Sequence, residues 1–164
     1  MTTYDFLDGA GEVPAHQHSN GGGWVADSTR VEASAFVGPD AKVYGTAEVY
    51  DNAGVYGHAV VYGAAQVYGN ALVFGNAKVH GNALVCEDAW IFGNAVVYGA
   101  AVVYGAAQVY DNAEVYGNAQ VYDNAVVCDD AWIFGNAEVY DNARVFGHAE
   151  VYGPPPGSMN SIGE

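Results

Sequence analysis

The chain has 164 residues, and its 19 Asp and Glu against 4 Lys and Arg give a formal net charge of −15 at pH 7. This length suits one domain with its own core, whereas the shortage of Lys and Arg argues against binding to nucleic acid or to an anionic membrane surface. No apolar run reaches the roughly 20 residues that a membrane-spanning helix needs.

The first segment, residues 1–24, is predicted to be an N-terminal arm with a Gly-rich linker at 21–23. Its beginning, MTTYDFLDGAGEVP, lacks the basic and apolar regions of a secretory signal. A cytoplasmic location is therefore expected, or a place in a virion or other assembly if a phage encodes the chain. His16 and His18 are candidates for half of a metal site, or for an active-site arm that reaches a neighbouring subunit. A flexible leader is favoured over both, because two ligands do not close a metal site.

A strict period of six follows the arm. From Val25 to Val151 every sixth residue is Val, or Ile at positions 91 and 133, and the residue four positions later is Ala as far as Ala149, except at Thr29. β-branched and aromatic residues followed by Gly-Asn favour short strands and turns over helix. Alternation along a strand places Val and Ala on one side, and the charged residues on the other side mark it as the outside. Gly-Asn is predicted to make the bend, because both residues adopt positive φ at low cost.

The pattern of an aliphatic residue with a small residue four positions later resembles the hexapeptide-repeat family, and residues 25–153 match it throughout. The resemblance implies an all-β fold, a left-handed parallel β-helix in which three hexads form one triangular coil. About seven coils are therefore expected, with Val and Ala stacked inside. The Val-Tyr-Gly-Asn-Ala repetition is also similar to uncharacterised proteins of bacteria and their phages, a similarity that implies no activity.

The two ends of the repeat are expected to differ from its middle. The coil from Val25 to Lys42 lacks outward tyrosines and is predicted to be a capping repeat. Residues 154–164 are predicted to be a Pro-rich cap and tail, because Pro154, Pro155 and Pro156 cannot extend a hydrogen-bonded ladder. The two cysteines, Cys86 and Cys128, are expected to be free thiols.

The register of the resembled family sorts the residues after each core Val onto three faces, each with an aromatic ladder. The first face carries Tyr44, Tyr62, His80, Tyr98, Tyr116, Phe134 and Tyr152. The second face carries Tyr50, Tyr68, Cys86, Tyr104, Tyr122 and Tyr140. The third face carries Tyr56, Phe74, Phe92, Tyr110, Cys128 and Phe146, together with Gly54, Leu72, Trp90, Gln108, Val126 and Arg144 from the positions before each Val.

The strands of the third face contain no acidic residue, unlike those of the other two faces. Depletion of charge around large apolar side chains is typical of interface cores. The sequence therefore predicts self-association through this face, with a homotrimer favoured. The predicted interface residues are Leu72, Phe74, Trp90, Phe92, Tyr110, Val126 and Tyr56.

The resembled family includes acyltransferases and γ-type carbonic anhydrases, whose active sites depend on histidines. Of the histidines in the repeat, His58 and His148 lie five coils apart, and His80 takes a tyrosine position in the first ladder. No catalytic residue, metal or cofactor is predicted from them. Asp123 and Asp141, one coil apart, are candidates for holding hydrated Ca²⁺, although a turn role explains both.

The segment VCEDAWIFGNA at 85–95 recurs as VCDDAWIFGNA at 127–137, an offset that moves each copied residue to another face. A catalytic site would be scrambled by this shift, whereas a rod would not. The leading prediction is a non-catalytic structural or interaction module. The alternatives are a trimeric acyltransferase-like enzyme with its site at subunit interfaces, and an acidic decoy that occupies a nucleic-acid-binding protein. Replacement of His80, or of His16 together with His18, is expected to leave the folded chain unchanged.

Overall fold

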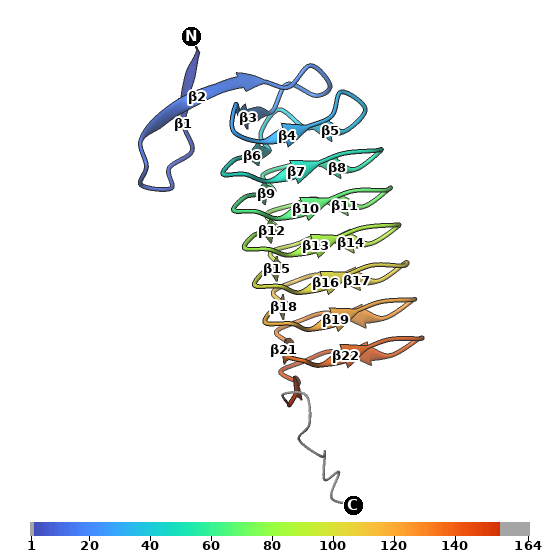
Figure 1. The fold of residues 1–164 in the computed structure, drawn as a ribbon. Helices are drawn as coiled ribbons and strands as arrows, with labels where there is room; N and C mark the ends of the chain where they lie inside the picture. The colour runs from blue at the N-terminus through green and yellow to red at the C-terminus, as the bar shows by residue number, and fades with distance from the viewer. Residues whose placement is uncertain (1, 155–164) are drawn as a thin grey trace, which may run out of the picture.

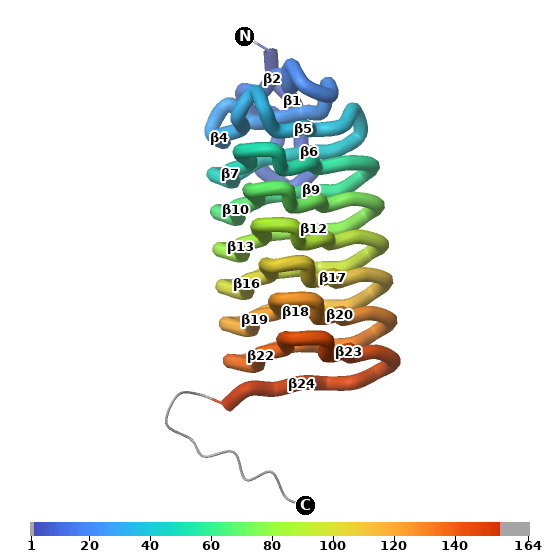
Figure 2. Tube along the Cα trace, turned by 90° about the vertical axis from the view of Figure 1, so that its right-hand side faces the viewer, coloured from blue at the N-terminus to red at the C-terminus, as the bar shows by residue number. Residues whose placement is uncertain are grey.

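The computed structural model describes residues 2–154, which form an all-β parallel solenoid of about seven turns with short strands stacked along one axis (Figures 1 and 2). The predicted fold class is confirmed. Within residues 2–154 no α-helix is found that could span a membrane. The predicted Pro-rich tail lies outside the described residues apart from Pro154.

Each of the three predicted faces is one sheet, and its repeated strands run parallel. The first face is formed by β3 (Trp24–Ala26), β6 (Lys42–Val43), β9 (Val60–Val61), β12 (Lys78–Val79), β15 (Val96–Val97), β18 (Glu114–Val115), β21 (Trp132–Gly135) and β24 (Glu150–Gly153). The second is formed by β4 (Arg30–Val31), β7 (Glu48–Val49), β10 (Gln66–Val67), β13 (Leu84–Val85), β16 (Val102–Val103), β19 (Gln120–Val121) and β22 (Glu138–Val139). The third is formed by β5 (Phe36–Val37), β8 (Gly54–Val55), β11 (Leu72–Val73), β14 (Trp90–Ile91), β17 (Gln108–Val109), β20 (Val126–Val127) and β23 (Arg144–Val145).

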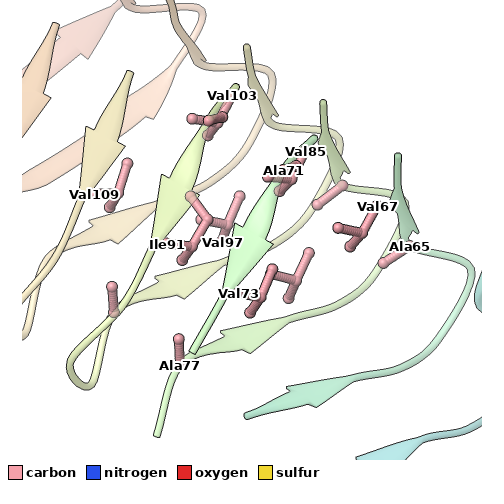
Figure 3. Close-up of a cluster of buried hydrophobic side chains, with 14 of the residues drawn as sticks. Ala65, Val67, Ala71, Val73, Ala77, Val85, Ile91, Val97, Val103 and Val109 are labelled. Carbon is pink, nitrogen blue, oxygen red and sulfur yellow. The ribbon is translucent and has the colours of Figure 1, made fainter. Parts of the chain in front are cut away.

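The core is the stack of Val, Ile and Ala side chains inside the three sheets (Figure 3). From Ala35 to Ile133 every core position of the repeat is fully buried. The residue before each core Val points outward, so one two-residue strand supplies one core side chain and one surface side chain. The inside and outside positions are therefore those that the sequence predicts.

The corners differ from the prediction in one respect. Positive φ falls on the first residue of each Gly-Asn pair, either Gly or an acidic residue such as Asp51 (φ 57°) or Glu87 (φ 59°), and no Asn of the described residues adopts it. The Asn side chains instead form ladders between coils, as in the 3.1 Å hydrogen bond from Asn76 Nδ2 to Asn94 Oδ1. Gly and Asn thus have separate roles, since one makes the bend and the other ties successive bends together.

The N-terminal segment is an ordered part of the first sheet. β1 (Thr3–Asp5) and β2 (Glu12–Gln17) form an antiparallel hairpin, and β2 pairs antiparallel with β3 at the end of the sheet (Figure 1). The Gly-rich stretch after β2 crosses the first coil, where the Gly23 amide donates to the Val37 carbonyl at 3.0 Å. The hairpin and the loop together cover open edges of the solenoid, so the backbone N–H and C=O groups at these edges are not left free to pair with another chain.

Candidate functional site

The third face carries a cluster of large apolar side chains that point outward. Phe74 and Phe92 stack with ring centroids 4.8 Å apart and nearly parallel planes, and Phe92 continues onto Tyr110 at 4.7 Å. Trp90 meets the edge of Phe74 at 6.3 Å and is 43% exposed. Leu72 pairs with Trp90 in the next strand. The predicted residues therefore lie together on successive coils of one sheet.

On both sides of this cluster the row of large apolar side chains is less continuous. Toward the N-terminal end, Tyr56 stacks on Phe36 at 4.6 Å. Toward the C-terminal end, Val126 pairs with Gln108 and lies two coils beyond Trp90, the strand partner of Leu72. Cys128 is buried and free, and it interrupts the aromatic ladder before the exposed Phe146. The compact centre of the candidate interface is accordingly Leu72, Phe74, Trp90 and Phe92.

Charge distinguishes the third face from its neighbours. Among its strands Arg144 is the charged outward residue, at the C-terminal end. The first face presents Glu114 and Glu150, and the second presents Glu48 and Glu138. Because the protein as a whole carries −15, two copies approach with least repulsion where outward strand positions lack acids.

The tyrosine ladders of the first and second faces are stacked but also bear polar contacts. On the first face Tyr98 stacks on Tyr116 at 4.9 Å, and its hydroxyl donates to Glu114 Oε2 at 3.3 Å. On the second face Tyr50 stacks on Tyr68 at 4.8 Å. Stacking with solvated hydroxyls stiffens a ladder without requiring a partner.

These contacts raise the pKa values of several tyrosines. A hydrogen bond with Cys86, followed by burial, raises the pKa of Tyr68 to about 12. Burial, followed by the nearby Glu114 carboxylate, raises the pKa of Tyr98 to about 12. Burial also raises the pKa values of Tyr62 and Tyr104. In each case the neutral phenol is favoured in the folded ladder.

We expect alkaline pH to destabilise the solenoid. Since the pKa values of Tyr68 and Tyr98 are raised from about 10 to about 12, the folded chain binds more protons than the unfolded chain between these pH values. The stabilisation is complete below pH 10 and is lost as pH rises toward 12. The test is to measure the urea concentration at half-unfolding at pH 8, 10 and 11.5, and to follow tyrosine ionisation by the absorbance of tyrosinate. A constant midpoint, with all tyrosines titrating near pH 10, would contradict it.

His80 and His148 do not lie at a common site. His80 lies within the first ladder between Tyr62 at 4.6 Å and Tyr98 at 5.1 Å, and burial, followed by Lys78, lowers its pKa. His148 Nδ1 lies 3.4 Å from Asp130 at a corner near the C-terminal end. No group of three His, Cys, Asp or Glu side chains within residues 2–154 is arranged to hold a metal ion.

His16 and His18 have different surroundings. His16 is exposed, with Nδ1 2.7 Å from Asp27 Oδ1. His18 is only 5% exposed, and its Nε2 lies 3.0 Å from the Ala35 carbonyl, which also accepts from Asn20 Nδ2 at 3.0 Å. His18 therefore holds the loop over the first coil, so we expect its replacement, unlike that of His16, to change stability.

We expect His18→Ala to lower the stability of the N-terminal coil by about 1–2 kcal/mol, because a buried hydrogen bond and its packing are lost. His16→Ala is the matched control and should change stability by less than about 0.5 kcal/mol, since its contact is exposed. Amide hydrogen exchange at Val37 and Gly23 measures the local effect. Equal protection of these amides in the two variants would show that His18 does not hold the loop.

The acidic corners have a structural role of their own. Asp129 Oδ2 accepts the Gly147 amide at 2.8 Å, and Glu87 Oε2 accepts the Gly105 amide at 2.9 Å, each one coil away. Asp123 Oδ2 accepts the Asp141 amide at 3.3 Å. The two candidate calcium ligands are thus engaged in a carboxylate-to-amide contact of the kind that other acidic corners make.

A concave surface for which the sequence predicted no site lies between the β1–β2 turn and the first face. Phe6 and Leu7 from the turn approach Lys42, Tyr44 and the coils below there. The available signal was the pair of short strand-like segments flanking Gly9 and Gly11, a hairpin pattern. Its docking position is a long-range contact that no local pattern specifies.

Comparison with known proteins agrees with the fold. The chain matches the family model described as YdcK Beta solenoid repeat over residues 65–81, 89–105, 107–120 and 119–135. No curated protein and no solved structure matches the chain. The matched segments lie within the stacked coils, so the central part of the chain is a β-solenoid repeat module.

Proposed function

We propose that the chain is a non-catalytic structural module that self-associates through the third face. The main observation in support is the cluster of Leu72, Phe74, Trp90 and Phe92. It lies on a sheet whose strands contain no acidic residue, in a protein of net charge −15. Large apolar side chains gathered at a charge-depleted surface are typical of an interface core.

The energetic gain rests mainly on Trp90. Phe74, Phe92 and Leu72 are already half-buried by neighbouring coils, whereas Trp90 remains 43% exposed. Full burial of one large apolar side chain is worth about 1.5–3 kcal/mol, and Trp90 gains the largest share of that on association. Several copies of this contact are required to offset lost rigid-body freedom.

A trimer is the favoured assembly because the acyltransferases of the hexapeptide-repeat family, which the chain resembles, usually work as trimers. The structure supports the choice of face, and the resemblance supports the number of copies. The duplicated segment also favours a non-catalytic role, since Trp90 lies on β14 of the third face and its copy Trp132 lies on β21 of the first.

Trp90 and Trp132 provide the test, because both are 43% exposed in the single chain. One protein keeps Trp90 and carries Trp24→Phe with Trp132→Phe. The other keeps Trp132 and carries Trp24→Phe with Trp90→Phe. We expect acrylamide to quench Trp132 equally at all protein concentrations and to quench Trp90 fully only after dilution. Equal quenching of both at high concentration would refute the proposed face.

A further inference from the structure

A hollow of about 320 Å³ lies between the β1–β2 turn and the first face. Phe6, Tyr44 and Tyr62 supply aromatic lining, and Lys42, Lys78 and His58 supply nitrogen donors. Its volume is at the lower end of the range for small-molecule pockets. It lies on a different sheet from the candidate interface, so it does not depend on self-association.

The aromatic wall is fixed by packing on both sides. Phe6 is 5% exposed and lies 4.9 Å from the ring of Tyr44, which stacks on Tyr62 at 5.0 Å. Behind them Tyr4 stacks on Trp24 at 4.4 Å, which holds the hairpin against β3. The wall is therefore built before any ligand arrives, which reduces the entropy lost on binding.

Half of the Lys and Arg residues of the chain lie at this hollow. Lys42 and Lys78 are two of the 4 Lys and Arg residues in the chain, and both line this hollow. They are aligned with Val60, which lies between them in the ladder of β6, β9 and β12. Two strand spacings separate their backbones by about 10 Å, a gap that two lysine side chains can bridge around one anionic group.

Neither lysine is neutralised within the described residues. Lys42 Nζ lies over the Tyr4 ring at 5.3 Å, and neither Lys42 nor Lys78 forms an ion pair there. Arg30, by contrast, contacts Glu32 at 3.0 Å and Glu48 at 3.5 Å. Asp40 also lines the hollow, but within residues 2–154 it forms no ion pair with Lys42 or Lys78, so both ammonium groups stay available to an anion.

Leu7 adds an apolar rim. It is 80% exposed and has a φ of 63°, a region that residues other than Gly seldom adopt. The Leu7 amide donates to Asp5 Oδ1 at 2.8 Å, which holds the turn in this form. A large apolar side chain kept in solvent by a strained backbone is a feature of ligand-binding loops.

We propose that this hollow binds a small aromatic carboxylate, with its ring against Phe6 and the tyrosines and its carboxylate between Lys42 and Lys78. A monoanion suits the site better than a phosphate dianion. Asp40 also lines the hollow, and the net charge of −15 repels a second negative charge more than it repels the first. Val60 forms the floor on which the ring edge rests.

The test uses naphthalene-2-carboxylate, with 2-naphthalenemethanol as its neutral counterpart and inorganic phosphate as an anion without a ring. Calorimetric titration of the full chain should give one carboxylate site per chain. We expect Lys42→Met with Lys78→Met to weaken carboxylate binding about tenfold or more, because two charge-assisted contacts are lost. Neutral alcohol should bind at least about tenfold more weakly than the carboxylate to the unmodified chain.

Arg144→Met is the matched control, since it removes a cation on the third face far from the hollow. It should bind the carboxylate as the unmodified chain does. Circular dichroism verifies that each variant is folded, and Leu7→Ser, on the exposed rim, provides a second variant that should weaken binding of the ring. The proposal is overturned if the alcohol binds as tightly as the carboxylate, if phosphate alone binds as tightly, or if the lysine variant and the Arg144 variant bind equally.

Discussion

We expect Val103→Asp to lower the free energy of unfolding by about 3–5 kcal/mol, the cost of an uncompensated charge inside a protein. Val103 has no exposed surface and pairs with Val85 above and Val121 below. A carboxylate at position 103 would be surrounded by apolar side chains. Because each coil hydrogen-bonds to the next, the damage should spread to adjoining coils.

Val102→Asp is the matched control, because Val102 is the other residue of β16 and points outward. The same substitution one residue away should cost less than about 1 kcal/mol, as surface changes usually do. Thermal and urea unfolding of both variants measure the difference. Similar losses in the two variants would mean that the inside and outside of the strand are not distinguished energetically.

The second large effect concerns assembly. We expect Trp90→Glu with Phe92→Glu to yield a folded monomer. Both side chains point away from the core, so the solenoid loses only stacking contacts, which are worth about 0.5–1.5 kcal/mol each. Two carboxylates at the centre of this charge-depleted interface remove its apolar contact and add repulsion between copies. Sedimentation velocity distinguishes this monomer from the assembled unmodified chain.

The duplicated segment supplies an internal control. Trp132→Glu with Phe134→Glu makes the same changes within the same local sequence, but on the first face. This variant should remain assembled. If both double variants dissociate, the effect is one of general charge or stability, and the third face has no special role.

The period of six predicts the core, because a short strand has only one way to bury Val and Ala while exposing charged residues. It also predicts which aromatic residues stack, as Phe74 and Phe92 show at 4.8 Å. The role of Asn was not predicted. Gly and Asn both tolerate positive φ, and only the geometry of stacked corners assigns the bend to Gly and the side-chain ladder to Asn.

The N-terminal hairpin was beyond local reasoning. Residues 1–24 follow no repeat, and the contact of Phe6 with Tyr44 depends on where a whole hairpin docks. The buried contact of His18 could not be predicted for the same reason, since its hydrogen bond to Ala35 exists only after the loop has crossed the coil. The third-face cluster could be predicted because the repeat itself places Leu72 and Trp90 in register.

Self-association is tested most directly by the mass of the unmodified chain in solution. Sedimentation equilibrium over a wide concentration range should give three times the chain mass of 17.1 kDa, with dissociation on dilution. Twice that mass would contradict the trimer without contradicting self-association. A mass of 17.1 kDa at every concentration would contradict self-association altogether.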